Sequence, residues 1–381
     1  MTGFGWSLLA TGVLSWLLAS RLRWAEVRVL ALVCLVLFVL CCAFTLGRTQ
    51  LLVKISLRPQ RVFAGETAAG QVSVRNLRRG RLPKIALELR IGPRPARLNM
   101  PSLGSGGSYQ EDFLVPTNRR GVIPVGPAST VRGDPFGLVR RAVRWTGVSE
   151  VFVHPRIIGL QPLDTGLLRD LEGQTTPDLS MADLEFHALR DYAPGDDRRY
   201  IHWRSSAKAS AGSQNGKFLI RQFLDTRRSH LTVVVDGDSR AYPDAEDFEL
   251  AVAAAASVAV RAIRDEVDTT VVAGRQVIDE GTAQRALDGF ARAELGNTPL
   301  AALTAQAARV APGTSIALIV TGSLTEFSEI RRAVAQFPLE VNTLILRVDP
   351  ANQTGLTSGV DLTVLNLAEL TDLPRLLGAG R

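Results

Sequence analysis

Cysteine and histidine are scarce in this 381-residue chain, and both shortages narrow the chemistry available to it. The three cysteines, Cys34, Cys41 and Cys42, all lie in one apolar run near the N-terminus. The rest of the chain therefore holds no disulfide framework and no cysteine-ligated metal site, which fits a reducing compartment. Only four histidines leave few candidates for a general base in nucleophilic catalysis.

Two motifs that mark common hydrolases are also missing. The chain has no Gly-x-Ser-x-Gly elbow and no glycine-rich phosphate loop, so it is not itself a nucleotide hydrolase. His202 lies close to Ser205 and Ser206, like half of a catalytic triad, but no orienting acid can be assigned. We therefore expect no enzymatic activity, no catalytic residue, no required cofactor and no nucleic-acid partner.

Charge is absent from two stretches near the N-terminus, residues 4–19 and 29–46. A helix needs about 20 apolar residues to cross a bilayer, and the first run approaches that length with its flanks. A signal peptide is the competing interpretation, but the run lacks a basic n-region and a small-residue cleavage site. We predict a two-helix membrane hairpin over residues 1–48, with Trp6, Trp16 and Trp24 as interface anchors.

The net charge of +7 divides unevenly along the chain. Residues 51–150 carry 17 Lys/Arg against 6 Asp/Glu, a net of +11, whereas residues 229–381 carry 12 against 20, a net of −8. Anionic head groups attract a basic segment next to a membrane, which favours contact with membrane lipid and a cytoplasmic body. Basic residues on the two sides of the hairpin nearly balance, so this segment alone supports the cytoplasmic side.

Residues 49–155 show short alternating runs broken by glycine, proline and asparagine. The runs GQVSVRN, KIALELRI, YQEDFLVP and SEVFVHP place apolar residues at every second position. Many short strands at this spacing predict an antiparallel β-sandwich of immunoglobulin-like type. Residues 156–228 follow as a polar linker that contains an unusual charged segment, and GKFLIRQFLD near its end predicts a strand.

Residues 229–381 alternate between buried strands, such as HLTVVVD and SIALIVTG, and amphipathic helices. This order predicts an α/β domain with a doubly wound parallel sheet, whose ligands bind beyond the carboxyl ends of the strands. Asp236, Asp238 and Ser239 lie at one such end and could hold Mg²⁺ through their oxygens. The same residue types are also favoured in turns and helix caps, so both interpretations stay open.

The segment from Arg190 to Lys208 reads RDYAPGDDRRYIHWRSSAK. Its Pro-Gly turn and following acids predict a capped helix, with Ile201 and Trp203 anchored inward. Arg190 or Arg199 could clamp one of the acids and so form an ion-pair network. The segment could be architectural, a recognition surface or a catalytic site, and we favour the architectural role.

This segment closely resembles the signature of the bacterial domain-of-unknown-function family 58 (DUF58). The matching positions are Arg190, Tyr192, Pro194, Gly195, Asp196, Arg199, Ile201, Trp203, Arg204, Ser206, Ala207 and Lys208. A second segment, RRGVIPVGPASTVRGDPFGLVRR, is similar to another motif of that family. It includes Arg120, Gly121, Gly126, Pro127, Asp134, Pro135, Phe136, Gly137 and Leu138.

The resemblance implies a C-terminal von Willebrand factor A-like domain. It also implies partnership with a MoxR-type AAA+ ATPase and, in some systems, with a transglutaminase-like membrane protein. No enzymatic activity is established for the family. The usual von Willebrand A metal site has Asp-x-Ser-x-Ser in its first loop, whereas this chain has Asp236-Gly237-Asp238-Ser239-Arg240, and Thr321 replaces a later Asp.

Three functions remain as hypotheses from the sequence. The first is a non-enzymatic membrane scaffold or adaptor that works with the ATPase in assembling or maturing envelope or other complexes. The second is a divalent-metal-dependent ligand-binding protein of the cell envelope that uses Asp236, Asp238 and Ser239. The third is a hydrolase that uses His202 and a nearby serine.

Overall fold

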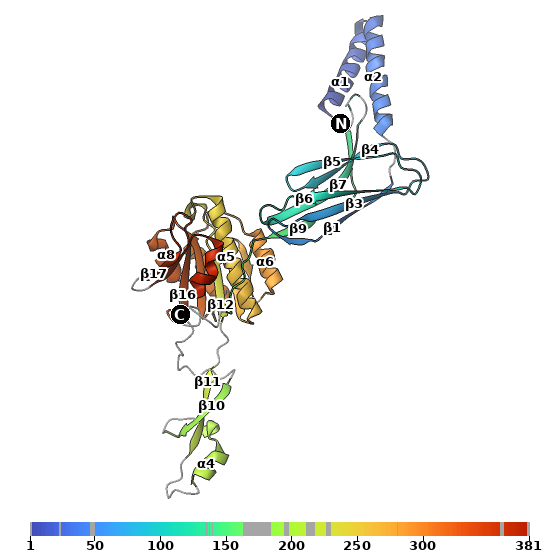
Figure 1. Cartoon of the computed structure of the whole chain (residues 1–381). Helices are drawn as coiled ribbons and strands as arrows, with labels where there is room; N and C mark the ends of the chain where they lie inside the picture. Colours follow the sequence, from blue (N-terminus) through green and yellow to red (C-terminus); the bar gives the residue numbers. More distant parts are fainter. Residues whose placement is uncertain are drawn as a thin grey trace. The chain divides into compact units, whose positions relative to one another are not determined.

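The computed structural model describes residues 2–22, 24–45, 50–133, 136, 138, 140–162, 184–193, 198–210, 218–225, 230–279, 281–358 and 362–378. The chain divides into two compact units, Met1–Arg156 and Ile157–Arg381. Figure 1 labels many of the helices and strands described below.

The first unit begins with two antiparallel helices, α1 (Gly3–Leu22) and α2 (Ala25–Thr45). Both are long and apolar enough to cross a membrane, as the two uncharged runs predict. Trp6, Trp16 and Trp24 are all largely exposed on this hairpin. An apolar surface of this kind is stable in lipid rather than in water, because no other part of the hairpin covers it.

In the described residues after the hairpin, the first unit forms nine strands. They are β1 (Leu51–Arg58), β2 (Arg61–Phe63), β3 (Ala68–Asn76), β4 (Ile85–Ile91), β5 (Arg94–Met100), β6 (Ser108–Val115), β7 (Gly121–Gly133), β8 (Arg140–Arg144) and β9 (Ser149–His154). The four alternating runs of the sequence lie in β3, β4, β6 and β9. One sheet has the order β1-β3-β6, and the other has the order β2-β9-β7-β4-β5 with β8 paired to β7.

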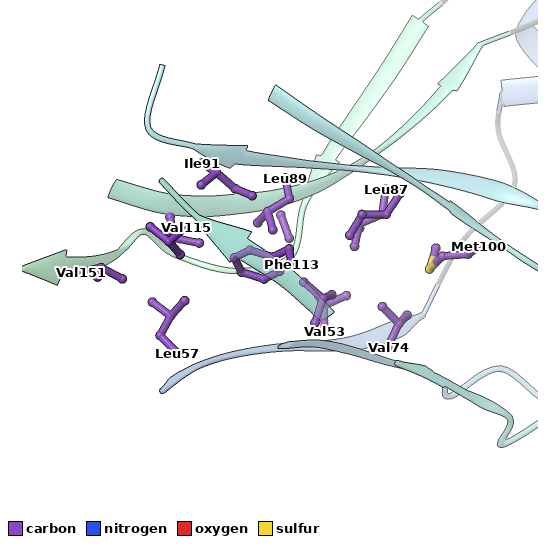
Figure 2. Close-up of a cluster of buried hydrophobic side chains, with 14 of the residues drawn as sticks. Val53, Leu57, Val74, Leu87, Leu89, Ile91, Met100, Phe113, Val115 and Val151 are labelled. Carbon is purple, nitrogen blue, oxygen red and sulfur yellow. The ribbon is translucent and has the colours of Figure 1, made fainter. Parts of the chain in front are cut away.

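The two sheets share one hydrophobic core. Figure 2 shows Val53 and Val74 of one sheet and Leu87 and Leu89 of the other pointing into the space between them. Leu87 and Leu89 are fully buried, which follows from the alternation of side chains along β4. The prediction of a purely antiparallel sandwich is wrong in one place, because β2 pairs with β9 in parallel.

The second unit contains a seven-stranded sheet in the order β14-β13-β12-β15-β16-β18-β17. Its strands are β12 (His230–Val235), β13 (Asp268–Ala273), β14 (Gln276–Ile278), β15 (Ile316–Gly322), β16 (Asn342–Val348), β17 (Gly355–Ser358) and β18 (Thr363–Leu367). The five inner strands are parallel, but both edge strands pair antiparallel to their neighbours. The sheet is therefore mixed, not wholly parallel as predicted.

Helices cover both faces of this sheet. They are α5 (Ala245–Arg264), α6 (Ala283–Arg292), α7 (Leu300–Val310), α8 (Phe327–Val334) and α9 (Leu373–Gly378), with 3-10 turns η2 (Ser239–Ala241) and η3 (Leu370–Asp372). Val234 and Ile319 pack on one face with residues of α7 and α8. Their neighbours Val233 and Leu318 point to the opposite face and are equally buried. The alanine-rich α5 packs on the sheet, and its buried side chains explain the continuous apolar strands.

A small module of the second unit holds the charged segment. It consists of β10 (Leu184–Asp191), η1 (Arg198–Tyr200), α4 (Trp203–Ser210) and β11 (Leu219–Asp225). The strands β10 and β11 pair antiparallel, and β11 lies within the run predicted as a strand. The predicted helix is present as α4, but it begins only at Trp203, after η1 and the bridge between Ile201 and Ile220.

Candidate functional site

The carboxyl ends of β12 and β15 lie side by side because these strands are parallel neighbours. Asp236 directly follows β12, and its backbone amide donates to the carbonyl of Val320 at 2.8 Å. Two residues later, the backbone amide of Asp238 donates to Oδ1 of Asp236 at 3.0 Å. The first strand and its turn thus place two carboxylates at the edge of the sheet where ligands of such folds bind.

Asp236 is almost fully buried, with 1% of its surface exposed. Its Oδ2 accepts a hydrogen bond from the hydroxyl of Thr321 at 2.7 Å, and Thr321 also bonds to Thr325 at 2.6 Å. Burial raises the pKa of this carboxyl to about 6, although the bonds from Asp238 and Thr321 favour the ionised form. Asp236 therefore changes charge near neutral pH.

Asp238 has the opposite electrostatic environment. Arg240 donates hydrogen bonds to both carboxylate oxygens of Asp238, with Nη2 at 2.6 Å from Oδ2 and Nε at 3.1 Å from Oδ1. The backbone amide of Arg240 also donates to Oδ1, so Asp238 caps the η2 turn. This bidentate pair lowers the pKa of Asp238 and keeps it ionised.

The arrangement of these residues does not fit a divalent cation. Both oxygens of Asp238 are bound to the guanidinium of Arg240, and Ser239 is exposed. Among the described residues, no group of three or more His, Cys, Asp or Glu side chains could hold a metal ion. A cation would have to displace Arg240 before it could reach a second carboxylate.

A polar cavity of about 310 Å³ opens at this edge of the sheet. Its lining includes Asp236, Asp238, Arg240, Glu326, Glu329 and Arg332. Leu324 also lines it and is 58% exposed, while the nearby Phe327 is 50% exposed. The guanidinium of Arg347 lies 5.5 Å from the ring centre of Phe327 and also donates to the carbonyl of Ser323.

Two parts of this site were missed by the sequence interpretation. Arg240 was noted only as a departure from a metal motif, although an arginine two residues after an aspartate can reach back to it. Leu324 and Phe327 carry no distinctive local pattern, because a leucine and a phenylalanine near a helix start are usually core residues. Their exposure depends on the tertiary structure.

The signature segment is distributed over the small module. Ile201 is buried as predicted, but Trp203 is 63% exposed, so its predicted inward anchoring is wrong. Tyr192 and Trp203 both contact Phe218, with ring centres 6.4 and 5.9 Å apart. Trp203 remains outside because two strands and one short helix are too small to bury a second large side chain.

The charged residues of the segment are only partly described. Arg190 lies in β10 opposite Ile220, and Arg199, Arg204 and Lys208 are exposed. Pro194, Gly195, Asp196 and Asp197 lie outside the described residues, so the predicted ion-pair network stays a prediction. Asp134, Pro135 and Gly137 of the second motif also lie outside them, while the intervening Phe136 is exposed.

Ser206 is buried, and its hydroxyl is hydrogen-bonded to backbone groups. It is 3% exposed, its hydroxyl donates to the carbonyl of His202 at 3.0 Å, and it accepts from the backbone amide of Leu219 at 2.8 Å. The Nδ1 atom of His202 accepts from the backbone amide of Ser205 at 3.2 Å. The bond from Leu219 ties α4 to β11, and the hydroxyl of Ser206 donates to a backbone carbonyl rather than to an imidazole.

Comparisons with known proteins add one assignment. A family model described as "Protein of unknown function DUF58" matches residues 188–354, from β10 to the loop before β17, and supports the DUF58 family. No curated protein matches the chain.

Several solved structures share limited similarity with it. The CARDB domain of the PF1109 protein from Pyrococcus furiosus is 21% identical over 28% of this chain and 88% of its own, with a TM-score of 0.22. The putative ApaA protein from Bordetella pertussis is 14% identical over 28% of this chain and 96% of its own, with a TM-score of 0.20. Similarity of this extent carries no argument about function.

Proposed function

We propose that this chain is a non-enzymatic, membrane-anchored scaffold whose α/β unit docks a soluble protein partner. The two apolar helices support anchoring in the cell membrane, and the basic residues 51–150 favour a cytoplasmic body. The family resemblance makes a MoxR-type AAA+ ATPase the expected partner, with a transglutaminase-like membrane protein as a further candidate. A role in assembling or maturing envelope or other complexes follows from that partnership.

One observation carries this proposal. Leu324 exposes 58% of its surface and Phe327 exposes 50%, and both lie beside a charged cavity at the carboxyl edge of the sheet. Phenylalanine and arginine side chains are enriched at protein interfaces, and Leu324 adds exposed apolar area next to them. Residues 229–381 carry a net charge of −8, so this unit would attract a partner with a basic face, and salt would weaken the association.

The fold details of the family resemblance belong to the same proposal. A von Willebrand A-like domain is supported by the parallel inner strands and by the site at their carboxyl ends. An immunoglobulin-like sandwich is supported by the two facing sheets of short strands. In this proposal the α/β unit binds its partner without a metal, because Arg240 already neutralises Asp238.

A pull-down of the ATPase with the detergent-extracted full chain tests the docking site. Leu324→Asp should weaken capture at low salt by tenfold or more, on the order expected for an interface anchor. Leu339→Asp is the matched control, because Leu339 is a fully exposed leucine of the same unit outside the site. Equal capture by the two variants would contradict the proposed docking surface.

A topology reporter fused after Arg381 tests the membrane side independently. A cytoplasmic signal is expected, and an exterior signal would remove a cytoplasmic ATPase as a direct partner. The metal-dependent alternative is addressed by the magnesium titration described in the Discussion.

A further inference from the structure

The module formed by β10, η1, α4 and β11 presents an aromatic and basic surface that the proposed docking site does not use. We call it the tip and define it by Tyr192, Arg198, Trp203, Arg204, Lys208 and Phe218. Trp203 is 63% exposed and Phe218 is 47% exposed, and their rings contact each other edge to face. Large aromatic side chains are costly to leave in water in this number on so small a module.

The outer face of α4 combines aromatic and basic groups. Trp203, Arg204, Ala207 and Lys208 are exposed, while Ser206 faces β11 and is buried. These exposed positions fall within about 140° of the helix circumference at 100° per residue. One side of α4 therefore presents a tryptophan at one edge and two positive charges beside it.

The sequence from Arg198 to Phe218, which contains α4, has only one sign of charge, whereas the exposed Asp191 precedes Tyr192 of the tip. From Arg198 to Phe218 there are five Lys/Arg residues and no Asp or Glu. The exposed apolar pair at the carboxyl edge of the large sheet differs in this respect, since Glu326 and Glu329 lie beside it. The tip is thus complementary to an anionic surface, whereas the docking site is not.

We infer that the tip is a second, reversible membrane contact that binds anionic lipid head groups through its basic residues and the interface through Trp203 and Phe218. Tryptophan favours the head-group region, and each Lys or Arg near an anionic leaflet adds about fivefold to association. An eight-residue helix with one tryptophan, flanked by Tyr192 and Phe218, is small for a stable protein interface of about 800 Å² per partner. A weak lipid contact suffices if the hairpin already holds the chain at a membrane, so the inference rests on the proposed anchoring.

The test uses the full chain in vesicles, with the photo-crosslinking residue p-benzoylphenylalanine in place of Phe218. After illumination we expect a lipid adduct by mass spectrometry, with a higher yield when phosphatidylglycerol is added to phosphatidylcholine. The same probe at Leu339 should give no adduct. In the probe background, Trp203→Ala should lower the yield, and Arg204→Gln should lower it by about fivefold if the adduct reports occupancy.

Two further probe positions make the outcome decisive. A probe at Ala207, on the exposed face of α4, replaces the Phe218 probe if that variant does not fold. A probe at Trp24 in the hairpin reports anchoring alone. Adducts at Trp24 without adducts at either tip position would overturn the lipid contact and leave the anchor intact. Crosslinks from the tip to a second copy in vesicles, or to another protein in cells, would also overturn the lipid contact. Absence of lipid adducts at all positions would overturn both the lipid contact and the membrane anchoring.

Discussion

The buried carboxyl of Asp236 should make the α/β unit less stable as the pH rises through neutrality. Its pKa is raised from 3.8 to about 6, mainly because burial removes water from the charged form. The folded state therefore binds the proton more tightly than the unfolded state does. Protonation stabilises the fold at low pH, and this contribution is lost as the pH rises through about 6.

The size of the effect follows from the shift. A difference between 3.8 and about 6 corresponds to about 3 kcal/mol at 1.36 kcal/mol per pH unit. Between about pH 5 and pH 7, the linkage relation gives a loss of about 1.3 kcal/mol in the free energy of unfolding. Asp236→Asn removes the charge, and its amide can still accept from the amide of Asp238 and donate to Thr321. The variant should be more stable than the wild type by up to about 3 kcal/mol above pH 7, and the two should converge at low pH.

Hydrogen exchange of the full chain measures this locally. Amides in β12 and β15 of the wild type should lose about tenfold in protection between about pH 5 and pH 7, after correction for intrinsic exchange. Asp236→Asn should remove that loss. Asp238→Asn is the control of opposite sign, because a lowered pKa stabilises the fold at higher pH. A pH dependence in Asp236→Asn equal to that of the wild type would refute the assignment to this carboxyl.

Two further predictions concern the candidate sites. Calorimetric titration with millimolar Mg²⁺ should show no binding to the wild-type chain. Arg240→Ala should create a weak site, because the substitution frees both oxygens of Asp238. Heat of binding from the wild type would support the metal-dependent alternative. Ser206→Ala should reduce the protection of β11 by about 1 kcal/mol, because it leaves the part-buried amide of Leu219 without its acceptor, and Ser205→Ala is the control. Loss of function in Ser206→Ala with unchanged protection would instead favour a catalytic serine.

Much of the fold could be predicted because its signal is periodic. The hairpin follows from two uncharged runs, and β4 follows from the alternation in KIALELRI. β12 and β15 were recognisable as continuous apolar strands, since helices cover both faces of their sheet. Such patterns record which side of an element is buried, and they do not depend on which partner buries it.

Pairing and exposure at the ends of elements could not be predicted in the same way. The parallel contact of β2 with β9 joins strands far apart in the chain, and no local pattern specifies it. Trp203 was predicted to point into the module, and tryptophan side chains are on average highly buried. Its exposure depends on how little of the module surrounds it, which the sequence of the segment does not show.

The two carboxylates at the end of β12 show that the charges around each residue say more about a metal site than the residue motif does. Asp236 and Asp238 are two residues apart, yet one pKa is raised and the other is lowered. A shared divalent cation would favour the ionised form of both groups. Here Arg240 compensates Asp238, and Asp236 accepts from a backbone amide and from the hydroxyls of Thr321 and Thr325. Because Arg240 occupies both oxygens of Asp238, this pairing bears on metal ligation more directly than the departures from the motif do.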